Sequence, residues 1–188
     1  MSIKQQIIIS GVGGQGVLFV TRLLADAAMA KGFAVLTSET HGMAQRGGTV
    51  VSHLKVGDFA SPLIRPFSAD GLLALKPESL AQHGGFVRPG GWAIVNSDQP
   101  LQGPGGLLIT FIDAESHARA IGNLKSVNLV MLGAALAGLS GSNDLFCTLA
   151  DIQAVLNAQI AGEPSKLERF SAAVHAGYRA GNRAGNRV

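Results

Sequence analysis

The stretch Ile7-Ile8-Ile9-Ser10-Gly11-Val12-Gly13-Gly14-Gln15-Gly16 decides the fold. A short β-branched run ends abruptly in a glycine-rich loop, and apolar residues at helical spacing follow at once, up to Lys31. This order predicts a buried strand over 5–10, a tight turn, and a helix over roughly 14–31. The first N–H groups of a helix have no partner within it, and its dipole is positive at that end. The turn is therefore suited to bind a phosphate or another anion.

Gly11, Gly13 and Gly16 have the spacing G-x-G-x-x-G. Glycine permits backbone angles that other residues avoid, and it lets another group come close. The motif alone is weak, and the simplest alternative is that these glycines serve only close packing of the strand on the helix. The strand before the motif and the helix after it favour an anion or a nucleotide-like ligand instead.

Composition narrows the class of protein. The chain has 188 residues, of which 47% are hydrophobic and 14% charged, against a usual charged share of roughly 25%. This fits one domain with a sizeable aliphatic core, and so low a charge indicates a surface that a partner covers in part. The net charge of +3 is too small and too scattered to indicate nucleic-acid binding. Cys147 is the single cysteine, which excludes an internal disulfide and an iron–sulfur cluster held by this chain alone.

Targeting signals are not evident in the sequence. The start lacks a basic stretch followed by a long apolar run. The longest apolar segment, 127–139, is too short to span a bilayer. We therefore expect a cytoplasmic protein that binds neither membrane nor metal.

A second apolar run, Phe33 to Thr37, makes the start a strand–helix–strand unit, which predicts parallel strands with a right-handed crossover. Glu39 follows this run, where an acid in a dinucleotide-binding fold holds a ribose hydroxyl. The loop that comes next carries His41, Gln45 and Arg46, and it is expected beside the glycine loop at the carboxyl edge of the sheet. The alternative is a solvated loop whose arginine pairs with a surface acid.

The rest of the chain continues the α/β pattern. Asp113 is a credible N-cap for a helix over 114–122, and the segment 127–139 has small residues at helical spacing and reads as a buried helix. The pattern predicts one domain over 1–180 and a flexible, glycine-rich tail over 181–188. The remaining expected elements are strands at 49–56, 69–75, 92–95 and 107–112, a helix opened by Pro77, and helices over 148–159 and 166–179.

Two motifs together support a family. The segment Gly11–Gly16, taken with Glu39–Gly48 and Val51-Ser52-His53, closely resembles the gamma-domain family of 2-oxoacid:ferredoxin (acceptor) oxidoreductases. Within that family, the chain is most similar to the small beta subunits of indolepyruvate ferredoxin oxidoreductases. The glycine loop is common among proteins, whereas the second motif is specific to the family. The resemblance continues through 70–75, 91–96 and the helix from Asn128, and so covers roughly 1–180.

The resemblance implies a fold, a reaction and partners. The fold would be a Rossmann-like three-layer sandwich with a mostly parallel central sheet. The full enzyme would oxidatively decarboxylate a 2-oxoacid, such as indolepyruvate or another arylpyruvate, to an acyl-CoA and pass two electrons to ferredoxin or a similar acceptor. Thiamine diphosphate and iron–sulfur clusters would lie in a larger partner subunit, and coenzyme A would be the cosubstrate. The isolated chain would be inactive.

No catalytic residue can be assigned from the sequence. The residues proposed to contact the cosubstrate are those of the two motifs and the end of a later strand: Gly11, Gly13, Gly14, Gln15, Gly16, Glu39, His41, Gln45, Arg46, Gly47, Gly48 and Asn96.

Two other functions stay open at this level. One is a free-standing nucleotide-binding protein of the NAD type, with Glu39 on the ribose. The other is a structural partner subunit without a ligand. The sequence also leaves open which 2-oxoacid is used and whether the isolated chain forms a homodimer.

Overall fold

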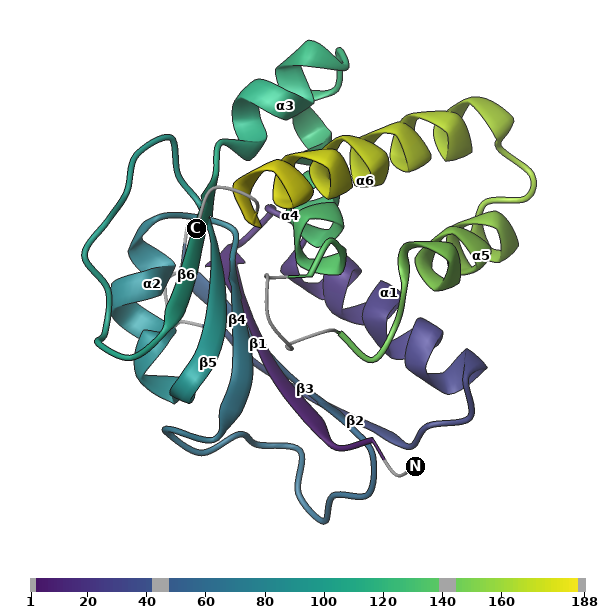
Figure 1. Cartoon of the computed structure of the whole chain (residues 1–188). Coiled ribbons are helices and arrows are strands. Elements are labelled where there is room, and N and C mark those ends of the chain that lie inside the picture. Colours follow the sequence, from purple (N-terminus) through teal and green to yellow (C-terminus); the bar gives the residue numbers. More distant parts are fainter. Residues whose placement is uncertain (1–2, 42–47, 139–144, 186–188) are drawn as a thin grey trace.

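A six-stranded sheet forms the centre of the molecule (Figure 1). The computed structural model describes residues 3–41, 48–138 and 145–185. The strands lie in the order β2-β3-β1-β4-β5-β6, and every neighbouring pair from β1 to β6 is parallel, whereas β3 is antiparallel to both β1 and β2. This confirms a mostly parallel sheet. The strands are β1 (Gln5–Val12), β2 (Val35–His41), β3 (Thr49–Val56), β4 (Ala69–Ala74), β5 (Val87–Asn96) and β6 (Leu108–Ile112).

The first strand–helix–strand unit differs from the simplest expectation. β1 and β2 run in the same direction, as predicted, but β3 lies between them and pairs with both. A short connection after β2 favours an antiparallel neighbour, because parallel strands need a long crossover. The chain therefore returns as β3 before it reaches β4, and the register places His41 opposite Val50 and Val50 opposite Gly11.

Two strands are longer than the apolar runs that predicted them. β2 continues past Thr37 to His41, and β5 begins at Val87 instead of Trp92. In β5 the pairing with β4 shifts register, and Gly90 has a φ of 76°. Its N–H donates to the carbonyl of Gly106 at 2.8 Å, so the segment that reads as a turn stays within the strand.

Helices cover the two faces of the sheet unequally. One face carries α1 (Val17–Ala30), α4 (Val127–Leu136), α5 (Leu149–Gln159) and α6 (Pro164–Gly185), with α3 (Ala114–Ala120) joining the same apolar cluster (Figure 1). The other face carries the short α2 (Glu78–His83) and the 3-10 turn η1 (Gly84–Phe86). A second 3-10 turn, η2 (Leu124–Ser126), precedes α4. The result is the expected three-layer sandwich with one thick and one thin outer layer.

The apolar run that opens the chain serves both layers. Ile7 and Ile9 belong to the large cluster on the α1 side, whereas Ile8 belongs to the smaller cluster on the α2 side. Successive side chains of a strand point to opposite faces, so a strand buried on both faces needs a continuous apolar run. This explains why the sequence shows no alternation between apolar and polar residues at 7–9.

Glycines hold α6 close against α4. An added Cβ at Gly133 would collide with the backbone of Val174, and one at Gly177 would collide with the backbone of Val130. Figure 1 shows α6 lying across α4, which is thereby enclosed between α6 and the sheet. This enclosure explains why α4 is apolar on all sides.

The end of the chain is more ordered than predicted. The glycine-rich segment after 180 was expected to be a flexible tail, but α6 continues to Gly185. Ala180 and Gly181 are buried, and a Cβ at Gly181 would lie 2.7 Å from Ala137 Cβ. Small residues at helical spacing let this last part of α6 pack on α4, which outweighs the low helix propensity of glycine. Residues 186–188 lie outside the described part.

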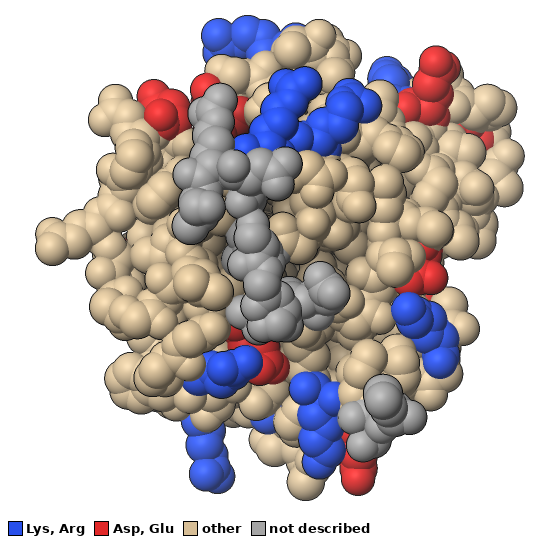
Figure 2. All heavy atoms as spheres, in the orientation of Figure 1, with Lys and Arg blue, Asp and Glu red and all other residues tan. Residues whose placement is uncertain are grey.

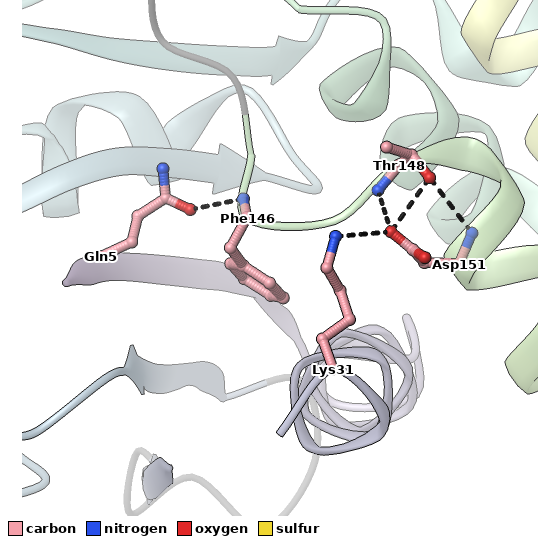
Figure 3. Close-up of polar contacts among 5 residues, drawn as sticks. All are labelled: Gln5, Lys31, Phe146, Thr148 and Asp151. Atoms are coloured by element: carbon pink, nitrogen blue, oxygen red, sulfur yellow. Dashed lines mark hydrogen bonds and ion pairs between the residues drawn. The ribbon is translucent and has the colours of Figure 1, made fainter. Parts of the chain in front are cut away.

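Polar contacts join α5 to the start of the chain (Figure 3). Thr148 and Asp151 form a capping box at the amino end of α5, and Lys31 donates to the same carboxylate at 3.0 Å. These contacts lower the pKa of Asp151, with the backbone N–H of Thr148 as the largest cause. Phe146 N–H donates to Gln5 Oε1 at 3.0 Å, so β1, α1 and α5 are linked at one corner.

Charged groups are sparse on the molecular surface. Figure 2 shows separate lysines, arginines and acids among residues that carry no charge.

Asp113 accepts a hydrogen bond from the Ser116 N–H and so caps α3, as predicted. Within the described ranges, no helix combines the length and the hydropathy needed to cross a bilayer.

Two histidines lie on the α2 side, His53 buried and His83 half-buried. Ser10 Oγ is 2.9 Å from His83 Nδ1, and the Ile64 N–H donates to His53 Nδ1 at 3.2 Å. Burial is the largest cause that lowers the pKa of both histidines, and the positive charge of Lys55 lowers that of His53 further. Both imidazoles are thus held neutral in the fold.

We predict that Gly177→Ala destabilises the protein. The new methyl group would meet the backbone of Val130, and such overpacking costs about 1–3 kcal/mol, more than the roughly 0.5–1 kcal/mol by which alanine favours a helix over glycine. Urea unfolding measures the change in the free energy of unfolding. Gly162→Ala is the matched control, because a Cβ there meets nothing within 4 Å. A Gly177→Ala variant as stable as this control would contradict the packing described.

We also predict a loss of stability at mildly acidic pH. A histidine whose folded pKa is lowered takes up protons more readily in the unfolded chain, so its contribution is present above the unfolded value of about 6.5 and decreases as the pH falls below it. Urea midpoints at pH 7.5 and 5.5 measure this decrease. His83→Gln should reduce the difference between the two midpoints, whereas the exposed His175→Gln should not. Equal pH dependence in His83→Gln and wild type would exclude this histidine as a source.

Candidate functional site

The parallel strands end along one edge of the sheet. β1 ends at Val12 and runs into the glycine loop, β4 is followed by Leu75, β5 ends at Asn96, and β6 is followed by Asp113. Ligands of open α/β sheets bind at this carboxyl edge. The candidate site is therefore built from the turns that follow these strands.

The Gln15 side chain closes the glycine loop upon itself. The side-chain Oε1 accepts from the Val12 N–H at 2.8 Å, and the backbone N–H of Gln15 donates to the Val12 carbonyl at 3.1 Å. A Cβ on Gly11 would lie 2.7 Å from this Oε1 and 3.2 Å from the Leu75 Cβ. Gln15 thus braces the loop, and Gly11 is glycine because the brace leaves no room.

The other glycines have different roles. Gly14 and Gly16 have φ angles of 90° and 80°, which only glycine adopts readily. Gly16 is the N-cap of α1, and a Cβ there would collide with the Asn128 amide. Around Gly13 and Gly14 an added Cβ would meet nothing within 4 Å. These two glycines form the open surface of the loop, beside a helix start that has no side-chain cap.

The second motif adjoins the first through its last residue. The Gly13 N–H donates to the Gly48 carbonyl at 3.2 Å, which places the end of the motif against the glycine loop. His41 ends β2 opposite Val50 at the same edge. Gln45, Arg46 and Gly47 lie outside the described residues.

Glu39 does not lie beside the glycine loop. It is opposite Ser52 of β3, which is opposite Ile9 of β1. Two strand spacings, about 9–10 Å, therefore separate its backbone from β1. In a dinucleotide-binding fold the corresponding acid follows a strand adjacent to the first one. The insertion of β3 therefore disfavours the NAD-type alternative.

Asn96 is buried and connects two elements. Its Nδ2 donates to the Leu75 carbonyl at 3.2 Å, and its Oδ1 accepts from the Ala114 N–H at 3.1 Å. These bonds tie the end of β4 to the start of α3. Asn96 therefore shapes the edge of the sheet, and its amide is already engaged.

Three pockets follow one another along the carboxyl edge. The glycine pocket, of about 400 Å³, is mainly apolar and is lined by Val12, Gly13, Gly14, Gly16, Val17, Leu18, Phe19 and Val50. The lysine pocket, of about 420 Å³, is lined by Gly14, Gln15, Leu75, Glu115, Leu124, Lys125, Val127 and Asn128. A third pocket, of about 320 Å³, is lined by Pro77, Asn96, Ser97, Asp98, Asp113, Glu115, Ser116 and Arg119. Gly14 is shared by the first two pockets, and Glu115 by the last two.

The lysine pocket contains residues that the sequence did not reveal. Lys125 lies on η2, and Asn128 lies in the first turn of α4 with its Nδ2 3.5 Å from the Gly16 carbonyl. Its Oδ1 accepts from the Leu129 N–H at 3.0 Å, so Asn128 is a buried polar group with partners. No local pattern marks Lys125, because only the fold brings η2 to a loop far away in the chain.

The third pocket is less suited to an anion. Hydrogen bonds from Ser116 are the largest cause that lowers the pKa of Asp113, so this carboxylate is ionised. Two more carboxylates, Asp98 and Glu115, line the same pocket, against one cation, Arg119. Among the residues that line the two pockets at Gly14, Lys125 is the one cation, and it shares its pocket with Glu115.

The side chains able to bind metal and the single cysteine of the described part of the chain do not indicate metal or thiol chemistry. No group of three or more histidines, cysteines or acids able to hold a metal ion occurs there. Cys147 is buried, and burial raises its pKa to about 12, so the thiol stays protonated.

Comparison with known proteins agrees with the two motifs. The family model of pyruvate ferredoxin/flavodoxin oxidoreductase matches residues 6–180. The chain is 43% identical over 94 residues to indolepyruvate oxidoreductase subunit IorB of Archaeoglobus fulgidus, a match covering 50% of this chain and 47% of that protein. It is 31% identical over 154 residues to the subunit of the same name from Thermococcus kodakarensis, covering 70% and 76%.

Solved structures share the fold along the whole chain. The gamma subunit of a keto/oxoacid ferredoxin oxidoreductase from Geobacter sulfurreducens superposes with a TM-score of 0.76 at 23% identity, covering 96% of this chain and 99% of that one. A 2-oxoglutarate:ferredoxin oxidoreductase from Magnetococcus marinus, with 2-oxoglutarate, coenzyme A and succinyl-CoA bound, gives 0.74 at 20% identity, covering 100% and 32%. The extent of the family match, together with the Thermococcus relative, shows that the chain belongs to the pyruvate ferredoxin/flavodoxin oxidoreductase family.

Proposed function

We propose that the chain is the small subunit of a 2-oxoacid ferredoxin oxidoreductase acting on indolepyruvate or another arylpyruvate, and that its carboxyl edge binds coenzyme A. The family and the names of its relatives support the first part. One observation carries the second: an apolar pocket and a pocket with a lysine meet at Gly14, whose surroundings are open.

Coenzyme A has the two kinds of surface that these pockets offer. Its phosphates are favoured by the uncapped start of α1 and by the Lys125 ammonium. Its pantetheine arm is long and largely apolar, which suits the glycine pocket. Gly13 and Gly14 would lie against the ligand, while Gly11, Gln15, Gly16, Gly48 and Asn96 would hold the shape of the edge. Arg46, with His41, Gln45 and Gly47, is proposed to complete the site from the second motif.

The proposed reaction requires a partner. A 2-oxoacid and coenzyme A give an acyl-CoA, carbon dioxide, one proton and two electrons, which pass to ferredoxin. One cysteine cannot supply the four thiolates of an iron–sulfur cluster, so the clusters and thiamine diphosphate are assigned to a larger subunit. The role of this chain is to hold the cosubstrate so that its thiol reaches the acyl group formed in that subunit.

Copurification tests this function directly. The tagged chain, coexpressed with its larger subunit, should yield a complex that reduces ferredoxin with indolepyruvate only when coenzyme A is present. The isolated chain should be colourless and inactive. Turnover by the isolated chain, or micromolar binding of NAD that Glu39→Ala abolishes, would overturn the proposal.

Lys125→Ala should weaken binding of coenzyme A by about three- to tenfold, because it removes a cation beside the proposed phosphate position. Glu115→Gln is the matched control: it removes a charge of opposite sign from the same pocket and should leave the affinity equal or higher. Calorimetric titration of the assembled complex measures both. Equal affinities in Lys125→Ala and wild type would place the phosphates elsewhere.

Arg46→Ala should raise the KM for coenzyme A about tenfold, since an arginine–phosphate bond of this charged kind contributes roughly 1.5–3 kcal/mol. Folding and subunit assembly should be unchanged. The competing account is that Arg46 only anchors the partner. A variant that copurifies poorly, with an unchanged KM in the complex that remains, would establish that account instead.

A further inference from the structure

One exposed aromatic side chain is held in a strained backbone conformation. Phe67 has a φ of 57°, and no other described residue except glycine has a positive φ. Bulky side chains avoid this region, so such a residue is a genuine outlier. Its side chain is 69% exposed. Strain that persists at an exposed position points to a function and not to packing.

The backbone around Phe67 is fixed by hydrogen bonds. The Phe67 N–H donates to the Gly85 carbonyl at 3.0 Å. The Ser68 N–H donates to the carbonyls of Phe86 at 2.9 Å and Arg65 at 3.2 Å. The segment is thus anchored to η1, and the phenyl ring is presented to solvent from a rigid base.

The same segment carries further groups typical of protein interfaces. Leu63 is 53% exposed, while its neighbour Ile64 is buried and bonded to His53. Arg65 is exposed between Leu63 and Phe67. Phenylalanine and arginine are both enriched at protein–protein interfaces relative to the rest of the surface.

Positive charge gathers beside these apolar groups. Two ammonium groups lie over the Phe59 ring, with Lys55 Nζ at 5.0 Å and Lys4 Nζ at 5.4 Å from its centroid. Lys55 is only 7% exposed, and after burial the charge of Arg65 is the next cause that lowers its pKa. None of these three cations has an ion pair within the described ranges. The one acid in segment 57–68 is Asp58.

We propose that residues 57–68, with Lys4 and Lys55, form a docking surface for the larger subunit of the complex, which would present carboxylates around an apolar recess for Phe67. This inference rests on the proposed function. A second copy of the chain is a poor occupant, because self-association would bring the uncompensated cations of two copies together. The protruding Phe67 side chain, held on a rigid backbone, fits a recess in a folded partner.

The location is compatible with a partner that also reaches the carboxyl edge. Segment 57–68 joins the end of β3 to the start of β4, so it lies at the opposite edge, on the thinly covered α2 side (Figure 1). A strand such as β3, with eight residues, is about 26 Å long. A standard interface covers about 800 Å² on each partner. One subunit lying over the α2 side can therefore contact both edges.

The test separates docking from folding. Phe67→Gly removes the ring and the strain together, so the isolated chain should unfold at the same or a higher temperature. Its affinity for the larger subunit, measured by biolayer interferometry, should fall about tenfold or more. Phe67→Asn, which tolerates positive φ, should behave alike. Met29→Ser is the control, since that side chain is 55% exposed and lies in the last turn of α1.

Charge reversal provides an independent arm. Arg65→Glu should weaken the complex and reduce its sensitivity to salt, whereas Arg179→Glu, on the exposed face of α6, should do neither. When excess Arg65→Glu subunit saturates the larger subunit, the kcat and the KM for coenzyme A of the complex should return to wild-type values.

Each other outcome has a defined meaning. Wild-type affinity in both Phe67→Gly and Arg65→Glu would overturn the docking surface and leave the proposed function intact. A wild-type chain that binds no larger subunit would overturn both. If gel filtration shows a dimer that only Phe67→Gly dissolves, with unchanged affinity for the larger subunit, the occupant is a second copy and the proposal is wrong.

Discussion

The close approach of Gly16 to Asn128 is the constraint on which the site depends. Because Gly16 has no side chain, the first turn of α4 packs directly on the first turn of α1. This contact brings η2, and with it Lys125, to the open side of the glycine loop. Gln15 closes the loop from within by bonding Val12, so the turn keeps its shape without help from a ligand. The site is thus set by packing between helices, and its lysine comes from a segment far along the chain.

Much of the fold could be predicted from the sequence because the decisive signals are local. The apolar run at 7–9, the glycine loop and the Asp113 cap each act within a few residues. The structure confirms the strand, the helix and the capped helix that they predict. The order of the strands could not be predicted this way, since the pairing of β3 between β1 and β2 depends on nonlocal hydrogen bonds. The helical end of the chain was missed for a related reason, because its small residues matter only against α4.

The candidate site divides in the same manner. The glycine loop and its contact with Gly48 follow from the motifs themselves. Lys125 carries no signal, because a lone lysine in a polar connection has many ordinary explanations. Asn96 illustrates the opposite case: its place at the end of a strand was foreseen, yet both of its amide atoms bind backbone groups, so its part is to join β4 to α3.

The thinly covered side of the sheet carries the strained Phe67 and cations without an ion pair among the described residues. The α1 side has several helices and a large apolar cluster, so little of its strand surface needs any other cover. The α2 side has one short helix, the buried His53 and the half-buried His83, whose pKa values are both lowered, and a lysine whose ammonium lies over Phe59. Burying the Lys55 ammonium without a carboxylate partner is costly for an isolated chain. Such an arrangement is stable in a protein whose thin side is completed by another molecule, and the low share of charged residues, 14%, is what a chain with a large covered surface would show.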